Sequence, residues 1–480
     1  MSDDDPKSSR GGRPGRRPAR PRDDDGPSWG ERPRRPAGPR DDRPRDNPWP
    51  SRPPRGAYRR EDERGAPARK PAKPSAAERL ADVDHLELRV EKIVAGGEGL
   101  ARFEGIPIFI PRSAPGDRLR VRVTERKSGF GRAEITEILE PGPDRRDAPC
   151  PHYDACGGCD LQHLDEKAQL KAKAAALVET LRRIGGVKEL PKRFQIVAGD
   201  PWGYRLRTQL HVETDERGAQ AGYFARGSND LVPVAACPIL MPQLERTVRR
   251  LPRLLRTGPT PQRFDLAAGD DGAFTCSPPH GKLPQGEVSI RIGAFTYEYD
   301  ARCFFQAHFS LTERLVTEAM GDAVLAGDAD DPEARGGAAF DLYAGVGLFA
   351  LPLSQRYDTV TAIDGDRVAI RFAKRNARQN GRGHVETVAQ AVESWIPNLP
   401  DRAERVLVDP PRAGLSGKVR GFLAARKPRR LTYVSCEPAT LARDLKYLRR
   451  LFDIESLTLL DMFPQTGHME SVVQLRRRDD

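Results

Sequence analysis

The sequence lacks the features that mark membrane and secreted proteins. No apolar run approaches the length that spans a bilayer, and no apolar segment follows the charged residues 1–10, as a secretory signal would require. The seven cysteines are irregularly spaced. This is not the pattern of a disulfide framework, and it suits metal binding or catalysis in a reducing compartment. We therefore expect a cytoplasmic protein without a membrane partner.

The positive charge is unevenly distributed along the chain. The formal net charge is +11, and residues 1–80 hold 22 Lys+Arg against 14 Asp+Glu. Sixteen of the 43 prolines fall before residue 75, among Arg, Asp and Gly. Such a segment cannot bury enough apolar surface to offset the entropy of ordering. We expect residues 1–82 to be a disordered basic tail, acting either as an electrostatic tether for RNA or as a solubilising extension.

Residues 84–141 show short runs in which apolar and polar residues alternate, separated by glycine turns. Leu86, Leu88 and Val90 form one such run, and Ile106, Ile108 and Ile110 form another. Five short strands in so few residues predict a small OB-like β-barrel. We expect one side of the barrel to be basic and suited to a nucleic-acid backbone. The residues concerned are Arg118, Arg120, Arg122, Arg126, Lys127 and Arg132.

Three cysteines lie within ten residues, at Cys150, Cys156 and Cys159, with Gly157 and Gly158 between the last two. The glycines allow the backbone to wrap closely, so the thiols look like ligands to a soft metal centre. A fourth ligand is needed, and Cys237 is the best candidate. Four thiolates suit either zinc or an iron–sulfur cluster, and the spacing does not decide between them.

The cysteines begin an α+β middle domain, residues 142–325. A helix is expected to end at Gly185 and Gly186, followed by a β-hairpin between about residues 206 and 225. Alternation in its first strand predicts that Arg205 and Arg207 face solvent, either as an RNA contact or as an ordinary solvated face. Farther along, Phe304 and Phe305 precede Gln306 and read as core residues.

In residues 326–480, strands alternate with helical segments, and seven strands are expected between residues 338 and 475. This order predicts a doubly wound, Rossmann-like α/β domain whose ligands bind at the carboxyl ends of the strands. Tyr343 and a Gly-x-Gly follow the first strand, and Asp364 ends the second. An acid there can bind both ribose hydroxyls of an adenosine cofactor. These two features alone leave a nicotinamide nucleotide possible.

Later strand ends carry Asp409, Cys436 and a closing segment with His468 and Glu470. Cys436 lies beside a helix N-terminus, where the dipole favours a thiolate. The convergence of these groups suits methylation at C5 of a pyrimidine. In that chemistry the cysteine adds to C6 to generate an enolate, and a base later removes the C5 proton. The residues alone do not choose between Glu470 and His468 as the base.

Residues 84–476 resemble the bacterial 23S rRNA uracil-5-methyltransferases. The resemblance runs from a TRAM-like barrel through the cysteine cluster to Asp-Pro-Pro-Arg, Val-Ser-Cys and Phe-Pro-Gln-Thr-x-His-x-Glu. It implies a methyltransferase domain with Cys436 as nucleophile and Glu470 as base. It implies S-adenosylmethionine contacts from Gln306, Tyr343, Asp364 and Asp409. It also implies a [4Fe–4S] cluster held by Cys150, Cys156, Cys159 and Cys237.

The sequence departs from the family pattern at a few positions, which are Glu437 for Asn, Asp364 for Glu, Gln390-Ala391 for Gly-Asp and His308 for Asn. Glu437 adds a negative charge that would raise the pKa of Cys436 if it lay nearby. We expect a monomeric enzyme acting on 23S rRNA. The alternatives are the same chemistry on tRNA, and a non-catalytic RNA-binding or ribosome-assembly protein with a degenerate methyltransferase domain.

Overall fold

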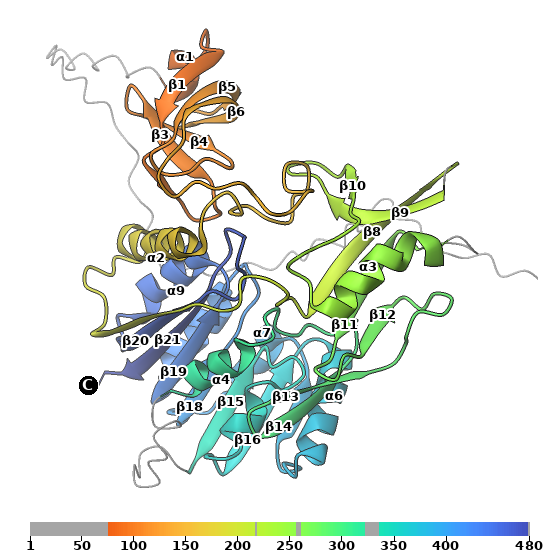
Figure 1. Ribbon diagram of the computed structural model, residues 1–480. Coiled ribbons are helices and arrows are strands. Elements are labelled where there is room, and N and C mark those ends of the chain that lie inside the picture. The colour runs from red at the N-terminus through yellow and green to blue at the C-terminus, as the bar shows by residue number, and fades with distance from the viewer. Residues whose placement is uncertain (1–74, 217, 256–260, 322–335, 479–480) are drawn as a thin grey trace, which may run out of the picture. The chain divides into compact units, whose positions relative to one another are not determined.

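The computed structural model describes residues 75–216, 218–255, 261–321 and 336–478 (Figure 1). The chain divides into two units, residues 1–71 and 72–480, and all the described residues belong to the second. Residues 1–74 of the expected tail lie outside the described residues. Residues 75–82 are part of the folded barrel instead, because Ala76 and Leu80 are buried in its core. Among the described helices, none has the length and apolar character needed to cross a membrane.

The barrel is one six-stranded sheet preceded by the short helix α1 (Ala76–Arg79). Its strand order is β1-β5-β6-β4-β3-β2. Leu88, Ile108 and Val121 point inward and are buried, as their alternation with polar residues predicts. The strands are β1 (His85–Arg89), β2 (Lys92–Ile93), β3 (Gly99–Phe103), β4 (Ile106–Ile110), β5 (Arg118–Arg126) and β6 (Gly131–Glu140).

The expected basic face of the barrel is electrically neutralised. Arg118 bonds to Glu140 (2.9 Å) and Glu87 (3.3 Å), and Arg120 bonds to Glu87 (2.9 Å). The other four also lie against carboxylates. Arg122 lies against Glu134 of β6, and Arg126 lies against Asp84 just before β1. Lys127 lies against Glu125 of β5, and Arg132 lies against Glu98 and Glu125. The cations lie where the sequence predicts them, but their pairing with carboxylates depends on how the strands and loops pack together.

The middle part contains a five-stranded antiparallel sheet of order β10-β9-β8-β11-β12. Its strands are β8 (Arg207–Asp215), β9 (Gly218–Phe224), β10 (Leu231–Pro233), β11 (Arg263–Ala268) and β12 (Phe274–Ser277). Helix α3 (Pro242–Leu254), which the sequence analysis did not predict, packs on β9 and β11. Leu244, Val248 and Leu251 form its buried face, so the 3.6-residue periodicity was present in the sequence. A separate hairpin joins β13 (Val288–Ile292) to β14 (Phe295–Tyr299).

The catalytic part is built on an eight-stranded sheet of order β17-β16-β15-β18-β19-β21-β20-β7. The first five of these strands are parallel, and β21 is antiparallel to both of its neighbours. All seven expected strands are present. They are β15 (Ala338–Leu342), β16 (Thr359–Asp364), β17 (Glu386–Ala389), β18 (Arg405–Val408), β19 (Arg430–Ser435), β20 (Phe452–Leu460) and β21 (Glu470–Arg477). This is the predicted doubly wound α/β arrangement.

Helices connect these strands and cover the sheet. They are α4 (Thr312–Met320), α5 (Ala350–Leu353), α6 (Arg367–Gln379), α7 (Val392–Trp395), the 3₁₀ turn η3 (Ile396–Asn398), α8 (Gly417–Arg426) and α9 (Pro438–Leu448). The last of them starts directly after Cys436 and Glu437. Pro438 therefore occupies the first helical position, as the sequence predicts.

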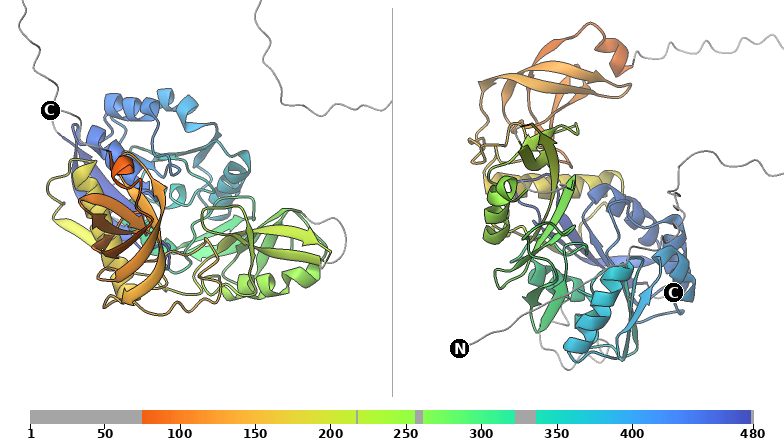
Figure 2. Two further views of the ribbon diagram at one scale, coloured as in Figure 1. Left: turned by 90° about the horizontal axis from the view of Figure 1, so that it is seen from above. Right: turned by 90° about the vertical axis from the view of Figure 1, so that its right-hand side faces the viewer.

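Two elements from the range assigned to the middle domain pack on the catalytic sheet instead. Strand β7 (Arg193–Val197) pairs in parallel with β20. Helix α2 (Glu166–Arg183) lies beside α9 (Figures 1 and 2), and its Leu177 and Leu181 share one apolar core with Leu441 and Leu445. Burial of this face against α9 explains the attachment. The cysteine loop, which immediately precedes α2, is thereby anchored to the catalytic part.

Candidate active site

The register between β19 and β21 brings Cys436 and Glu470 together. The two strands are antiparallel, and Ser435 lies opposite Ser471. Continuing that register by one residue places Cys436, at the end of β19, opposite Glu470, at the start of β21. Cys436 is half-buried, whereas Glu470 is only 3% exposed. A nucleophile and a carboxyl group thus meet at one edge of the sheet.

Asp409 follows β18 and lies at the same edge. The last residue of β18, Val408, is paired with Leu342 of β15 and with Tyr433 of β19. The Gln306 side chain donates a hydrogen bond from Nε2 to Asp409 Oδ2, at 3.2 Å. The structure therefore joins Gln306, from the segment before α4, to the catalytic sheet.

Burial and mutual repulsion raise the pKa values of these acids. Burial is the main cause for Glu470, and the charge of Asp409 adds to it, so the pKa of Glu470 lies well above its usual range. Burial raises the pKa of Asp409 to about 7, against the lowering effect of the Gln306 hydrogen bond and with a further rise from Asp364. This edge of the sheet therefore carries an excess of acidic groups.

The expectation that the helix dipole favours a Cys436 thiolate is wrong for the protein without ligands. Burial raises the pKa of Cys436 to about 12, and Glu470 and Asp409 contribute to the rise. Arg412 acts in the opposite direction but is outweighed. The helix-end position was identified correctly, but burial, together with two carboxylates from other strands, outweighs its effect on the pKa of Cys436.

The loop after β15 and the end of β16 form the candidate cofactor edge. The Asp364 carboxylate accepts hydrogen bonds from the backbone N–H groups of Gly345 (2.9 Å) and Asp366 (2.8 Å). Tyr343 has a φ of 66°, and its hydroxyl donates to Glu393 Oε1 at 3.1 Å. A left-handed tyrosine is uncommon and marks a constrained loop, which is frequent at ligand sites.

Sequence reasoning missed two carboxylates at this edge. Asp341 is fully buried near the end of β15, and burial together with the charge of Asp409 raises its pKa well above the usual range. Glu393 lies in the first turn of α7 and bonds to Tyr343. The sequence showed Asp341 next to the Gly-x-Gly, but only the parallel pairing of β15 with β18 brings it near Asp409.

The departures from the family pattern have structural explanations or are exposed. Glu437 caps α9 by accepting a hydrogen bond from the Ala439 N–H at 3.3 Å. His308 is fully buried and stacks on Tyr204 with 4.6 Å between ring centroids, and burial lowers its pKa to about 4. Gln390 and Ala391 are exposed after β17. None of these residues removes a group from the Cys436 edge.

The four candidate cysteine ligands line one cavity of about 290 Å³, together with Arg205, Tyr223, His468 and other residues. His152 also lines this cavity, where its Nε2 accepts from the Ala235 N–H. His163 contacts Tyr153 and Ser113 instead. Among the described residues, no group of three or more His, Cys, Asp or Glu side chains has the spacing for a metal ion. The four thiols thus line one cavity, but among the described residues they are not positioned to coordinate one metal ion.

The arginines of the β8 hairpin do not form the expected solvent face. Arg207 is half-buried, donates to the Ala301 carbonyl at 3.0 Å and lies 6.0 Å from the Phe304 ring. Arg205 lines the cysteine cavity. Phe304, expected in the core, is 63% exposed, whereas Phe305 is buried as predicted. Two residues before Gln306, the protein therefore presents an exposed aromatic ring.

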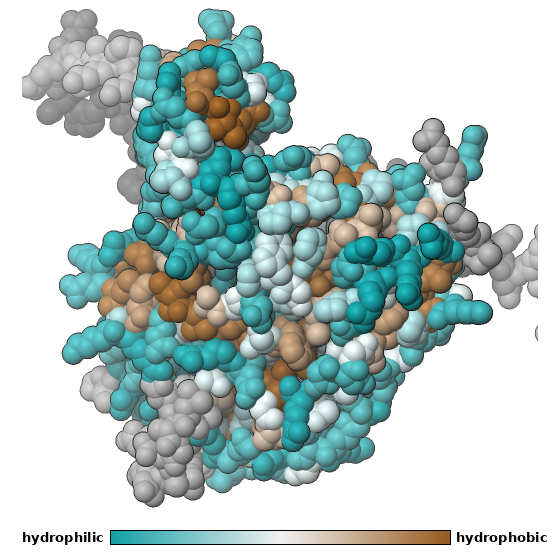
Figure 3. Space-filling model, viewed as in Figure 1, coloured by the Kyte–Doolittle hydropathy of each residue, from teal (hydrophilic) through white to brown (hydrophobic). Residues whose placement is uncertain are grey.

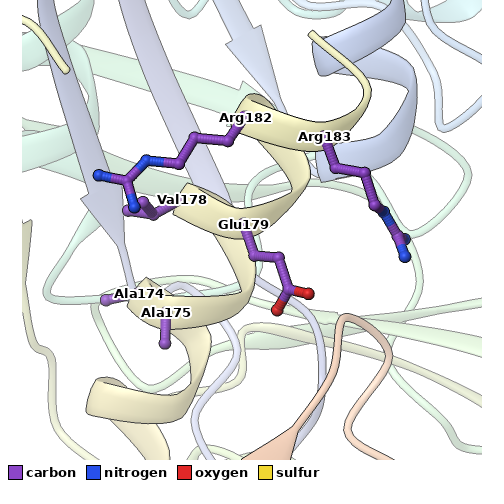
Figure 4. Close-up of a pocket in the computed structure, with 6 residues that line it drawn as sticks. All are labelled: Ala174, Ala175, Val178, Glu179, Arg182 and Arg183. Carbon is purple, nitrogen blue, oxygen red and sulfur yellow. The ribbon is translucent and has the colours of Figure 1, made fainter. Parts of the chain in front are cut away.

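A second hollow, of about 630 Å³, lies along α2 and is unrelated to this chemistry (Figure 4). Its only acidic group, Glu179, already pairs with Lys92 of the barrel at 2.7 Å. The remaining lining residues are apolar side chains and arginines, namely Ala174, Ala175, Val178, Arg182 and Arg183. This hollow has no nucleophile or second acid, so it is not a second catalytic centre.

Comparisons with known proteins agree with this arrangement. A family model described as tRNA (Uracil-5-)-methyltransferase matches residues 398–478, and a TRAM domain model matches residues 83–136. The chain is similar to the 23S rRNA (uracil(1939)-C(5))-methyltransferase RlmD of Pectobacterium atrosepticum, with 31% identity over 434 residues, covering 81% of this chain and 93% of the relative. It is 30% identical to an uncharacterized RNA methyltransferase of Aquifex aeolicus, covering 82% and 99%.

A crystal structure shows the same fold. It is that of the Pyrococcus abyssi tRNA (uracil-54, C5)-methyltransferase in complex with S-adenosyl-L-homocysteine, with a TM-score of 0.61 and 24% identity. The match covers 81% of this chain and 100% of that chain. The sequence relatives, the two matched models and the Cys436 edge agree. The chain belongs to the RNA (uracil-5-)-methyltransferase family, and its barrel is a TRAM domain.

Proposed function

We propose that this protein transfers a methyl group from S-adenosylmethionine to C5 of a uridine in 23S rRNA, through a covalent bond between Cys436 and C6. The observation that carries the proposal is the β19–β21 register, which places Cys436 opposite Glu470 beside Asp409. The choice of rRNA is supported by the similarity to the Pectobacterium relative over 93% of its length.

The side chains present can carry out each proton and bond change on the base. The half-buried thiol of Cys436 first gives its proton to solvent. Sγ then adds to C6, and the displaced electron pair of the C5–C6 double bond forms an enolate that makes C5 nucleophilic. S-adenosylmethionine supplies the electrophilic methyl group that C5 takes. The Glu470 carboxylate then removes the C5 proton. The electrons of that C–H bond restore the C5–C6 double bond, and Sγ leaves C6 with its electron pair.

Glu470 is a better candidate for the base than His468. The register places Glu470 opposite Cys436, and its raised pKa makes the ionised carboxylate a strong base. His468 is instead directed toward Arg412, with 3.3 Å between Nε2 and the guanidinium. Burial and the nearby Arg412 lower the pKa of His468. The choice that the sequence left open therefore favours Glu470.

The acidic edge fits a cationic cofactor. Asp409, Asp364 and Asp341 lie at adjacent strand ends. Besides burial, the charges of Asp409 and Asp364 raise the pKa of Asp341, and the charge of Asp364 raises the pKa of Asp409. A sulfonium and an ammonium group would relieve this repulsion. We assign S-adenosylmethionine binding to Gln306, Tyr343, Asp364 and Asp409, with Asp364 toward the ribose hydroxyls. Phe304 offers an exposed ring against which a base can pack.

The cysteine cavity fits an iron–sulfur cluster. Its donors are four thiols, which favour soft metals and suit zinc as well as a cluster. The resemblance of the sequence to the 23S rRNA uracil-5-methyltransferases is what favours the cluster over zinc. We propose that Cys150, Cys156, Cys159 and Cys237 hold a [4Fe–4S] cluster. When bound, it would supply covalent cross-links between the cysteine loop and the segment after β10.

The test uses the purified protein, S-adenosylmethionine, and unmodified rRNA and tRNA in separate reactions. Nucleosides are then measured by mass spectrometry. We expect 5-methyluridine in 23S rRNA only, and none with Cys436→Ala. We expect Glu470→Gln to accumulate a protein–RNA adduct on denaturing gels, because the C5 proton is not removed and Cys436 is not released. Product in tRNA alone would overturn the rRNA assignment.

The same reactions test the non-catalytic alternative. Absence of product from either RNA, with S-adenosylmethionine bound in calorimetry, would support a degenerate enzyme. Two observations argue against that alternative. Glu437 serves as the N-cap of α9, and the sheet edge keeps Cys436, Glu470 and Asp409.

A further inference from the structure

We propose that helix α3 and the groove beside it form a second RNA-contact surface, which binds backbone phosphates of the substrate RNA outside the catalytic crevice. The inference rests on the proposed function, since it concerns how the same RNA is held. It does not involve the residues that line the cysteine cavity or those at the Cys436 edge.

Helix α3 carries a stripe of exposed arginines. Leu244, Val248 and Leu251 face the core, and the opposite side displays arginines that recur every three or four residues. At about 5.4 Å per helical turn, these side chains form one continuous row. The row consists of Arg246, Arg249, Arg250 and Arg253. The space-filling view shows strongly hydrophilic side chains gathered over this part of the molecule (Figure 3).

Most of this positive charge is not neutralised. Arg249 pairs with Glu245 of the same helix. Within the part of the chain that the structure describes, Arg246, Arg250 and Arg253 have no carboxylate partner and donate no hydrogen bond. The barrel shows the opposite arrangement, because Arg118, Arg120 and Arg122 each bond to a glutamate. Unpaired cations attract phosphates more strongly than those already bound to carboxylates.

A groove of about 270 Å³ runs between α3 and the segments around β12. Its lining includes Arg246, Arg250, Lys282 and the half-buried ring of Phe274, and none of the lining residues is acidic. Three cations can bind phosphate oxygens, and an aromatic ring can stack with an unpaired base. Cations beside an aromatic ring suit single-stranded or looped RNA, whose unpaired bases can stack on the ring. Cations alone would bind any phosphate backbone equally well.

RNA is the occupant that the observations favour. The chain belongs to an RNA-modifying family, and the cations of the barrel, where an RNA face was expected, are neutralised by glutamates. The α3 row therefore supplies positive charge that is not neutralised, whereas Arg118, Arg120 and Arg122 of the barrel are paired with glutamates. An acidic protein is the competing occupant, and the experiment below separates the two.

The test compares two triple variants of the full chain that lose the same net charge. One is Arg246→Gln/Arg250→Gln/Arg253→Gln on α3, and the control is Arg118→Gln/Arg120→Gln/Arg122→Gln on the barrel. Dissociation constants for a 23S rRNA fragment are measured by fluorescence anisotropy over a series of KCl concentrations. Thermal unfolding temperatures close to that of the wild type show that each variant is folded.

For the α3 triple we expect affinity to fall about tenfold or more at moderate salt. We also expect the slope of log affinity against log salt to decrease by about 2 to 3, since each phosphate contact contributes about 0.7 to 0.9. The barrel triple should change both quantities much less. An α3 triple that binds RNA like the wild type would overturn the inference, as would equal losses in both triples, which would indicate a general charge effect.

This experiment is independent of the methylation assay. If the wild type methylates rRNA and the α3 triple binds it normally, only the second surface is wrong. If the wild type makes no 5-methyluridine, the proposed function fails, while the comparison of the two triples still shows whether α3 binds RNA. Unchanged RNA binding would leave an acidic protein as the alternative occupant of the row.

Discussion

The Asp160 carboxylate accepts a hydrogen bond from the backbone N–H of Gly467 at 2.9 Å, and this joins the cysteine loop to the loop that precedes Glu470. The other Asp160 oxygen accepts from Arg226 at 2.7 Å. The barrel turn also reaches this point, because a Cβ on Gly467 would lie 2.3 Å from the Gly96 carbonyl carbon. Three segments distant in sequence thus fix one loop three residues before the proposed base.

We expect Asp160→Ala to loosen this loop and slow methylation. Loss of two hydrogen bonds, one of them to a charged arginine, removes about 2 to 4 kcal/mol of local stabilisation. Hydrogen exchange at residues 465–468 should become faster, and kcat should fall by about tenfold or more. Asp154→Ala is the matched control, because that side chain is 99% exposed in the same loop. Unchanged exchange in Asp160→Ala would show that the contact does not hold the loop.

Cofactor affinity should depend on pH through Asp409. Its pKa is raised to about 7, so the carboxylate is largely protonated below pH 7 and ionised above it. A cationic cofactor prefers the ionised form. Calorimetry should therefore show S-adenosylmethionine affinity falling by up to about tenfold per pH unit below 7 and levelling off above it. Asp409→Asn should bind weakly and lose this dependence. A pH-independent affinity in the wild type would contradict the assignment.

Cysteine substitutions should divide into two classes. Serine at Cys150, Cys156, Cys159 or Cys237 should lower the iron and sulfide content and the thermal unfolding temperature, since a thiolate ligand is lost. Cys276 is the matched control, because it is buried in the apolar core of the middle part, away from the four-cysteine cavity. Cys276→Ser should keep iron and sulfide at wild-type levels. Zinc without iron in anaerobically purified protein would overturn the cluster.

Breaking the buried ion pair between Lys173 and Asp461 should weaken the attachment of α2. The two side chains are 2.6 Å apart and 2% and 8% exposed, and Lys173 also donates to the Phe463 carbonyl. Lys173→Met leaves Asp461 buried without its cation, which should cost about 3 to 5 kcal/mol of unfolding free energy. Adding Asp461→Leu should restore part of that loss. Denaturant unfolding measures both, and equal stability of Lys173→Met and wild type would contradict the prediction.

Much of the fold followed from local patterns. Apolar alternation predicted a barrel of five strands, where the structure has six. The succession of strand and helix segments predicted the seven strands of the catalytic part, and helix periodicity predicted α2. The same periodicity was present in α3 but was not recognised, because Arg residues separate its leucines. The candidate site residues were also found from the sequence, because they are polar or reactive side chains that directly follow apolar strands.

The errors concern contacts between distant segments. Glu87, Glu134 and Glu140 neutralise the arginines of β5 only because β1 and β6 flank that strand. Beyond burial, Glu470 and Asp409 raise the pKa of Cys436, because the ends of β18 and β19 and the start of β21 lie at one edge of the sheet. Ala76 and Leu80 lie in the range expected for the tail but pack in the barrel core. Elements α2 and β7 lie in the range expected for the middle domain but pack on the catalytic part.

The sequence by itself determined which side chains are available and at which strand ends they lie, because turns, caps and apolar periodicity are local properties. Only the tertiary structure decided that Cys436 lies opposite Glu470 and that four thiols surround one cavity. It also decided that, among the described residues, Arg246, Arg250 and Arg253 of α3 have no carboxylate partner. These properties depend on strand order, register and burial, which arise when residues far apart in the chain pack together.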